Sequence, residues 1–175
     1  MKAFARIVAL LLLAALLPLC ALAEEPTVEA EELPRFPEFS LTDQYGRVWT
    51  NEDLAGKRVF LNIWTTWCPY CIQEMPDIEK LYQDTGLNEG DTVILGLDPL
   101  TMDNTDAAGV IAFLQEQGVT YPVLIDTDGA LFSQLDVEGY PTTYFILPDG
   151  TVPGYMPGMM TYNTMVQLLD LIVAQ

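Results

Sequence analysis

The segment Trp67-Cys68-Pro69-Tyr70-Cys71 holds the residues of this sequence whose types and spacing point most directly to chemistry. A C-x-x-C pair cycles between a dithiol and a disulfide, and so can pass two electrons to another disulfide. We expect Cys68 to be the attacking thiolate, because it opens a predicted helix whose N-terminal N–H groups and dipole favour an anion. Cys71, nearly one turn into that helix, is expected to resolve the mixed disulfide formed with the substrate.

Three other interpretations compete for this cysteine pair. A zinc site needs four ligands, and the chain has no His and only one further cysteine, Cys20. A purely structural disulfide would close a loop too short to stabilise the fold by much. A peroxidatic cysteine would fit Thr65, three residues before Cys68, but Leu61 stands where that motif carries proline. Disulfide exchange fits better than these, and it predicts no metal and no cofactor besides the cysteine pair itself.

The composition of the 175 residues narrows the class of protein further. Half of them are hydrophobic (50%), which is enough for one packed domain with a tail. Seven Lys and Arg against 25 Asp and Glu give a net charge of −18, which argues against a nucleic-acid partner. The absence of His excludes His-based triads and imidazole acid–base catalysis.

Residues 1–23 have the pattern of an export signal. Lys2 and Arg6 precede a short apolar run, and Ala21-Leu22-Ala23 supplies the small-x-small motif of a cleavage site. We expect cleavage after this motif, with an uncleaved membrane anchor or lipidation at Cys20 as the alternatives. Each of these outcomes places the rest of the chain outside the cytoplasm, where disulfides persist.

Residues 24–38 are rich in acids and prolines and show no periodicity, so we interpret them as an extended linker. The linker is either an inert tail or, if residues 1–23 stay in the membrane, a tether. The folded domain is expected over residues 39–175.

The sequence after residue 39 alternates between apolar strands and amphipathic helices. Strands are expected at residues 47–50, 58–64, 92–97, 121–125, 142–147 and 152–155. Helices are expected from residue 69 to about residue 82, and at 107–117, 129–135 and 163–174. This order predicts an α/β domain with a mixed central sheet that is flanked by helices on both faces.

Four segments, residues 59–76, 121–129, 139–146 and 158–161, carry motifs that together resemble the TlpA/ResA-like branch of the thioredoxin superfamily. The resemblance implies a thioredoxin-like fold with that branch's extra helix–strand segment before the Pro141 loop. It also implies an exported, usually membrane-tethered thiol–disulfide oxidoreductase. Members commonly reduce protein disulfides, some of them in apocytochrome c, and usually take electrons from a membrane thiol transporter.

The resemblance also assigns roles to residues outside the cysteine pair. Pro141 matches the family's cis-proline, whose loop faces the cysteines, and the Tyr140 backbone would pair with a bound substrate chain. The alternative for Pro141 is an ordinary proline at the start of a strand. Glu74 matches an acidic residue that could exchange protons with the Cys71 thiol, the alternative being a solvated helix residue. Asn62 stands where cytoplasmic thioredoxins carry a buried Asp, which leaves Glu74 as the nearby proton carrier.

Aromatic residues around the motif are expected to divide between the core and the substrate. Trp64 is expected in the core, whereas Trp67, Pro69 and Tyr70 are expected to contact an unfolded substrate. The Pro69-Tyr70 dipeptide departs from the family pattern, which more often has proline second, and this dipeptide tunes the reduction potential. The sequence therefore leaves three functions to compare. They are a reductase of protein disulfides, an oxidase or isomerase of secreted proteins, and a non-enzymatic client-binding module.

Overall fold

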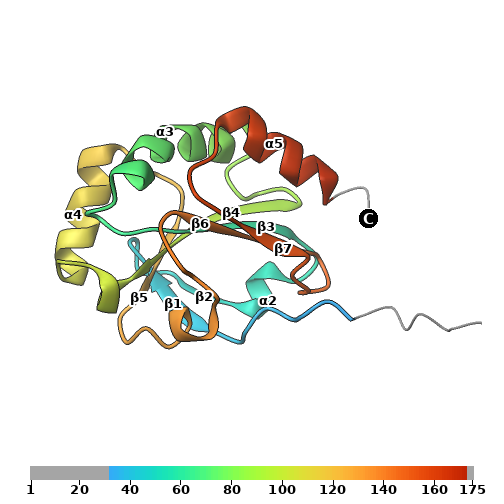
Figure 1. The fold of residues 1–175 in the computed structure, drawn as a ribbon, viewed down its shortest axis with the longest axis horizontal. Coiled ribbons are helices and arrows are strands. Elements are labelled where there is room, and N and C mark those ends of the chain that lie inside the picture. Colours follow the sequence, from blue (N-terminus) through green and yellow to red (C-terminus); the bar gives the residue numbers. More distant parts are fainter. Residues whose placement is uncertain (1–31, 173–175) are drawn as a thin grey trace, which may run out of the picture. The chain divides into compact units, whose positions relative to one another are not determined.

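The computed structural model describes residues 32–172, which form an α/β domain around one mixed sheet (Figure 1). The strands are β1 (Ser40–Asp43), β2 (Val48–Thr50), β3 (Arg58–Ile63), β4 (Thr92–Pro99), β5 (Val123–Asp126), β6 (Thr142–Ile146) and β7 (Gly154–Pro157). Their order in the sheet is β2-β1-β5-β4-β3-β6-β7. β3, β4 and β5 run parallel to one another, and the remaining pairs are antiparallel.

Helices cover both faces of this sheet, as the sequence predicts, but unequally. The helices are α2 (Asn51–Leu54), α3 (Pro69–Asp84), α4 (Ala107–Gln117) and α5 (Tyr162–Leu171), with short 3₁₀ turns η1 (Leu100–Met102) and η2 (Phe132–Gln134). The three longer helices enclose one core with Phe60, Ile94 and Phe145, and side chains of α2, η2 and β2 enclose a second core with Leu61 and Leu95. Figure 1 shows α3 and α5 on one side of the sheet and α2 on the other.

Helix α3 begins at the cysteine motif because the local sequence favours a helix start there. Cys68 is its N-cap residue, and Pro69 occupies the first turn, where its missing N–H leaves no bond unmade. Apolar residues then recur at helical spacing, and Met75 and Ile78 are buried against the sheet. Pro76 lies inside α3, and the helix continues past it to Asp84.

Helix α4 and strand β5 form the extra helix–strand segment that the resemblance implies. α4 covers residues 107–117, as expected from the sequence. The Asp106 side chain accepts a hydrogen bond from Gly109 N at its start, and Gly118 ends it with a φ of +69°. β5 then pairs in parallel with β4 through Gly96↔Val123 and Leu97↔Leu124. The right-handed crossover rule places α4 on the same face as α3.

The folded region begins before Phe39, the start that the sequence suggested. Phe36 is only 5% exposed and packs edge-on against Phe39, with 6.0 Å between the ring centroids. Phe36 N donates to Gly150 O at 2.9 Å, and Val152 N donates to Pro34 O at 2.8 Å. The last part of the acidic segment is therefore packed rather than free, because an aromatic ring anchors it.

Two further details differ from the expected elements. Within residues 129–135, where a helix was expected, the structure has the short turn η2 at Phe132–Gln134. Asp126 accepts a hydrogen bond from Phe132 N, and the chain becomes extended at Leu135. The last hairpin strand covers Gly154–Pro157 rather than 152–155. The expected signal segment and most of the linker lie outside the described residues, and within 32–172 no helix has the length and apolar character to cross a membrane.

Candidate active site

The two cysteines lie where the chain leaves the central strand β3 and enters helix α3. Trp64 N donates to Leu97 O at 3.1 Å, so the loop after β3 starts beside the carboxyl end of β4, a usual place for sites in parallel sheets. Cys68 and Cys71 form a disulfide with their Cα atoms 5.3 Å apart. Cys71 N donates to Cys68 Sγ at 3.2 Å, which would also stabilise a Cys68 thiolate.

The two sulfur-bearing residues differ in their position on α3. Cys68 is 3% exposed and sits at the helix N-terminus, whereas Cys71 is 1% exposed and lies within the first turn, against the core. A thiolate at Cys68 benefits from the unpaired N–H groups of the helix end. This arrangement suits attack by Cys68 and resolution by Cys71.

The residues beside the two cysteines in the sequence are exposed. Trp67 is 47% exposed and Tyr70 is 63% exposed, and Pro69 is exposed as well. The Trp67 ring meets the Tyr140 ring edge-on at 5.8 Å between centroids, which brings the loop before β6 to the cysteine motif. Trp64, by contrast, is fully buried and stacks on Phe113 of α4, as its expected place in the core requires.

The peptide bond between Tyr140 and Pro141 is cis, as expected from the resemblance. Pro141 is buried, and its carbonyl oxygen accepts a hydrogen bond from Gly158 N at 2.8 Å. The contact between Trp67 and Tyr140 thus brings together the two segments that hold the expected substrate-contacting residues. These residues are Trp67, Pro69, Tyr70, Tyr140 and Pro141.

Glu74 is fully buried one turn after Cys71, which excludes the alternative of a solvated helix residue. Its Oε1 accepts a hydrogen bond from Met160 N at 2.7 Å, and its Oε2 accepts one from Asn62 Nδ2 at 3.1 Å. Asn62 Nδ2 also donates to Thr143 Oγ1 at 3.0 Å. Asn62 therefore orients Glu74 rather than replacing it as a proton carrier.

The environment of Glu74 shifts the pKa of its carboxyl group to near neutral pH. Burial raises the pKa of Glu74 to about 7, against the hydrogen bonds from Met160 and Asn62, which favour the carboxylate; the charge of Asp77 raises it further. A carboxyl with this pKa can accept or release a proton at physiological pH.

The structure also brings two acids to the cysteine loop that the sequence reasoning missed. Asp98 ends the apolar run of β4, and Asp103 follows η1 and binds Thr66. The sequence offers one signal for this site, which is Asp98 at the end of an otherwise apolar run. An acid in such a place attracts notice because buried acids are rare unless they are paired.

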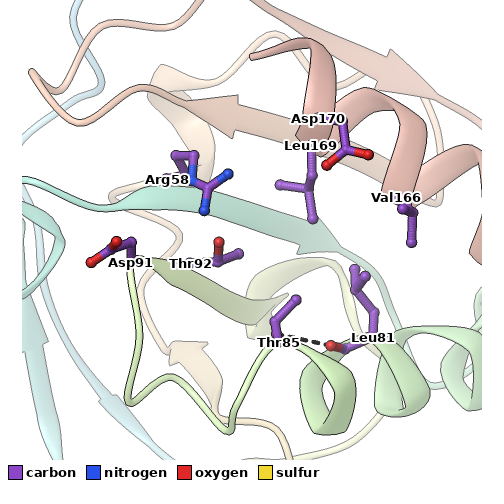
Figure 2. Close-up of a pocket in the computed structure, with 8 residues that line it drawn as sticks. All are labelled: Arg58, Leu81, Thr85, Asp91, Thr92, Val166, Leu169 and Asp170. Carbon is purple, nitrogen blue, oxygen red and sulfur yellow. Dashed lines mark hydrogen bonds between the residues drawn. The ribbon is translucent and has the colours of Figure 1, made fainter. Parts of the chain in front are cut away.

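A pocket of about 280 Å³ lies away from the cysteine loop, between β3, β4, α3 and α5 (Figure 2). It is lined by Arg58 and Thr92 at the amino ends of their strands, whereas Cys68 follows the carboxyl end of β3. Among residues 32–172, no group of three or more acids and cysteines is placed to hold a metal ion.

Comparison with known proteins places this site in a family. The Redoxin family model matches residues 32–161. The thioredoxin-like protein YneN of Bacillus subtilis is 35% identical over 144 residues, which cover 82% of each chain. The thiol–disulfide oxidoreductase ResA of Bacillus subtilis is 33% identical over 136 residues, covering 78% of this chain and 73% of ResA. The exposed lipoprotein thioredoxin Etrx1 of Streptococcus pneumoniae has a TM-score of 0.65 at 26% identity and covers 77% of this chain and 99% of Etrx1. The chain therefore belongs to the Redoxin family, as a ResA/TlpA-like thiol–disulfide oxidoreductase of the thioredoxin superfamily.

Proposed function

We propose that this oxidoreductase acts as a reductase of protein disulfides outside the cytoplasm. The Cys68 thiolate attacks a substrate disulfide and forms a mixed disulfide, releasing one substrate thiolate. The Cys71 thiolate then attacks Cys68 Sγ, which releases the second substrate thiolate and leaves the Cys68–Cys71 disulfide. Two electrons pass to the substrate, the cysteine pair carries them without a prosthetic group, and a dithiol donor must restore the pair.

The acidic surroundings of the cysteine pair are the observation that supports the proposed direction of electron flow, from the protein to its substrate. Residues 59–77 contain no Lys or Arg. Helix α3 instead carries the buried Glu74, and the Asp103 carboxylate, which follows η1, accepts a hydrogen bond from Thr66 N of the loop. Negative charge near a thiol disfavours its thiolate, so the reduced pair is stabilised less than in strongly oxidising relatives of the fold. A less stable dithiol is a stronger reductant.

Glu74 is proposed to exchange the proton of the Cys71 thiol. The two residues are three positions apart on α3, so they share one face of the helix, and both are buried. Cys71 must lose its proton before it can resolve the mixed disulfide, and a buried thiol cannot give that proton directly to water. A carboxyl whose pKa lies at about 7 is suited to take the proton and to return it.

The exposed aromatic residues Trp67 and Tyr70 suit an unfolded, cysteine-containing polypeptide as the substrate. The Tyr140 backbone is proposed to pair with the substrate chain as an added strand, with Trp67 and Tyr70 contacting apolar side chains. Apocytochrome c is the proposed client and a membrane thiol transporter the proposed donor, both from the family resemblance. Residues 1–23 are proposed to direct export, in keeping with a relative described as an exposed lipoprotein. The relatives are oxidoreductases, so the chain is an enzyme rather than only a client-binding module.

Electron transfer in both directions tests the proposed function. In one reaction, the reduced protein meets a peptide that carries the oxidised C-x-x-C-H segment of a c-type cytochrome. In the other, the oxidised protein meets a reduced, unfolded secreted protein such as ribonuclease. We expect fast loss of the peptide disulfide and little oxidation of the ribonuclease, each measured by thiol trapping and mass spectrometry. The reverse pattern would establish an oxidase and contradict the proposal.

A further inference from the structure

Helices α3 and α5 are neighbours on one face of the sheet (Figure 1), and Asp77 of α3 accepts a hydrogen bond from the start of α5. Its Oδ2 lies 3.0 Å from Tyr162 N, the first backbone N–H of that helix. The first N–H groups of a helix have no partner inside the helix, and the Thr161 side chain bonds a different one, Thr164 N. Asp77 therefore supplies, from the neighbouring helix, a hydrogen bond that α5 cannot provide for itself.

The same segment donates a hydrogen bond to Glu74, which lies three positions before Asp77 on α3. Met160 N lies 2.7 Å from Glu74 Oε1, and both residues are buried. Only Thr161, the N-cap residue of α5, separates Met160 from Tyr162. A shift of the start of α5 away from Asp77 would therefore move Met160 N away from Glu74.

The side chain of Tyr162 makes two further contacts with α3. Its phenol donates to Asp84 Oδ2 at 2.7 Å, and Lys80 Nζ lies over its ring, 4.0 Å from the centroid. Lys80 also forms an ion pair with Asp84. These contacts hold the side chain of Tyr162, whereas Asp77 holds its backbone. A substitution of Asp84 is therefore a matched control for a substitution of Asp77.

We propose that Asp77 is a positioning residue for the buried Glu74: by holding the first N–H of α5, it keeps Met160 N on Glu74 Oε1. The hydrogen bond from Met160 N favours the carboxylate form of Glu74, so its loss would make Glu74 hold its proton more tightly. The consequence for disulfide exchange rests on the proton transfer between Cys71 and Glu74 proposed above.

Asp77 acts on Glu74 in two opposite directions. Its negative charge raises the pKa of Glu74, whereas the hydrogen bond from Met160 N, which Asp77 maintains, lowers that pKa. Asp77→Asn removes the charge but keeps an oxygen that can accept from Tyr162 N. Asp77→Ala removes both, and alanine suits a helix interior, so α3 should still form. The difference between the two variants therefore isolates the hydrogen bond.

Three groups that interact with Glu74 keep one charge state near neutral pH in the oxidised protein. Asn62 of β3 donates to Glu74 Oε2 and does not ionise. Burial raises the pKa of Tyr121, and the charges of Glu74 and Glu79 raise it further, so this phenol stays neutral. Cys71 is held in the disulfide and does not titrate. A titration of the oxidised protein near neutral pH can therefore follow Glu74 itself.

NMR titration of the oxidised full-length protein tests the positioning of Glu74. The Glu74 carboxyl carbon, assigned by its absence in Glu74→Gln, gives the midpoint of ionisation, and the Met160 amide proton reports the hydrogen bond. In Asp77→Asn we expect the midpoint to fall below the wild-type value of about 7, because the charge is lost. In Asp77→Ala it should lie about one pH unit above that of Asp77→Asn, the size expected for one hydrogen bond to a carboxylate.

Asp84→Ala is the matched control, because it removes another carboxylate of α3 that binds Tyr162, but through the phenol. In this variant the Glu74 midpoint and the Met160 amide signal should keep their wild-type values. Equal Glu74 midpoints in Asp77→Asn and Asp77→Ala would overturn the proposal. So would a Met160 amide signal that is unchanged in Asp77→Ala, since Asp77 would then only join the two helices.

Kinetics separate this positioning from the proposed role of Glu74. The reduced protein reacts in a single turnover with a peptide disulfide over a pH series, and the transition that Glu74→Gln removes is assigned to Glu74. We expect this transition to lie about one pH unit higher in Asp77→Ala than in Asp77→Asn, as in the NMR titration. If the NMR midpoints differ and the rates do not follow them, the proton transfer proposed for Glu74 is contradicted and its positioning by Asp77 stands.

Discussion

Replacing Cys68 with serine should abolish disulfide exchange, and replacing Cys71 with serine should instead trap substrates as stable mixed disulfides. Cys68 is the N-cap residue of α3, and its sulfur accepts the hydrogen bond from Cys71 N. Loss of the attacking nucleophile should lower the rate of insulin reduction by about 10³-fold or more. Cys71→Ser should still attack, but it has no thiol with which to release the substrate.

Mass spectrometry of trapped species provides the readout for this pair of variants. Cys20 is the remaining cysteine of the chain, so both variants and the parent protein should carry Cys20→Ser as a common background. We expect a peptide disulfide on Cys68 in Cys71→Ser and none on Cys71 in Cys68→Ser. Efficient trapping on Cys71 in Cys68→Ser would reverse the two roles and contradict the mechanism.

The stability of the oxidised protein should fall as the pH rises from about 5 to about 8. The pKa of Glu74 rises from 4.5 in the unfolded chain to about 7 in the folded protein, and the pKa of Asp98 rises from 3.8 to about 8. The folded state therefore binds more protons than the unfolded state in this range, so raising the pH favours unfolding. For Glu74 alone the shift corresponds to at most about 3.5 kcal/mol, at about 1.4 kcal/mol per pKa unit.

Urea unfolding of the oxidised protein at several pH values measures this effect. Glu74→Gln and Asp98→Asn should each flatten the dependence of the unfolding free energy on pH, and the double variant should flatten it further. Each amide keeps the shape of the acid but does not titrate, so the comparison isolates ionisation. Two results would contradict the inference that these two carboxyl groups are buried in the protonated form. One is an unfolding free energy that rises between about pH 5 and pH 8, and the other is a double variant with the wild-type slope.

The features that the sequence predicts well are those that short stretches of chain determine. The helices at residues 107–117 and from residue 69 onward follow from helical spacing, with a capping Asp106 and a terminal Gly118. The disulfide at the start of α3 follows from a C-x-x-C between an apolar strand and a helix. Local pattern is sufficient there because the strand, turn and helix are adjacent in sequence.

The burial of Glu74 could not be decided in this way, because it depends on distant residues. Met160, which donates to its carboxylate, is 86 positions away, and Asn62 comes from the neighbouring strand β3. A helix residue one turn after Cys71 could equally face solvent until the loop before α5 covers it. The family resemblance raised the buried alternative, and the tertiary fold decided it.

Asp98 and Phe36 were missed for related reasons. The strand expected at residues 92–97 stopped short of Asp98, because a charged residue ordinarily ends an apolar run. Asp103 reaches Thr66 only through the turn η1, and no strong sequence pattern predicts that turn. Phe36 lies among acids and prolines, whose composition outweighed one aromatic residue, yet its ring packs into the core beside Phe39.

The reduction potential of the Cys68–Cys71 pair tests most directly whether the protein is a reductant. The protein, with Cys20 replaced by serine, is equilibrated against dithiothreitol or glutathione buffers, and tryptophan fluorescence follows the redox state of the pair. The acidic surroundings of the cysteines predict a potential at or below about −220 mV. A value of about −120 to −150 mV would make the protein an oxidant of secreted proteins, and it would contradict the proposed direction of electron flow.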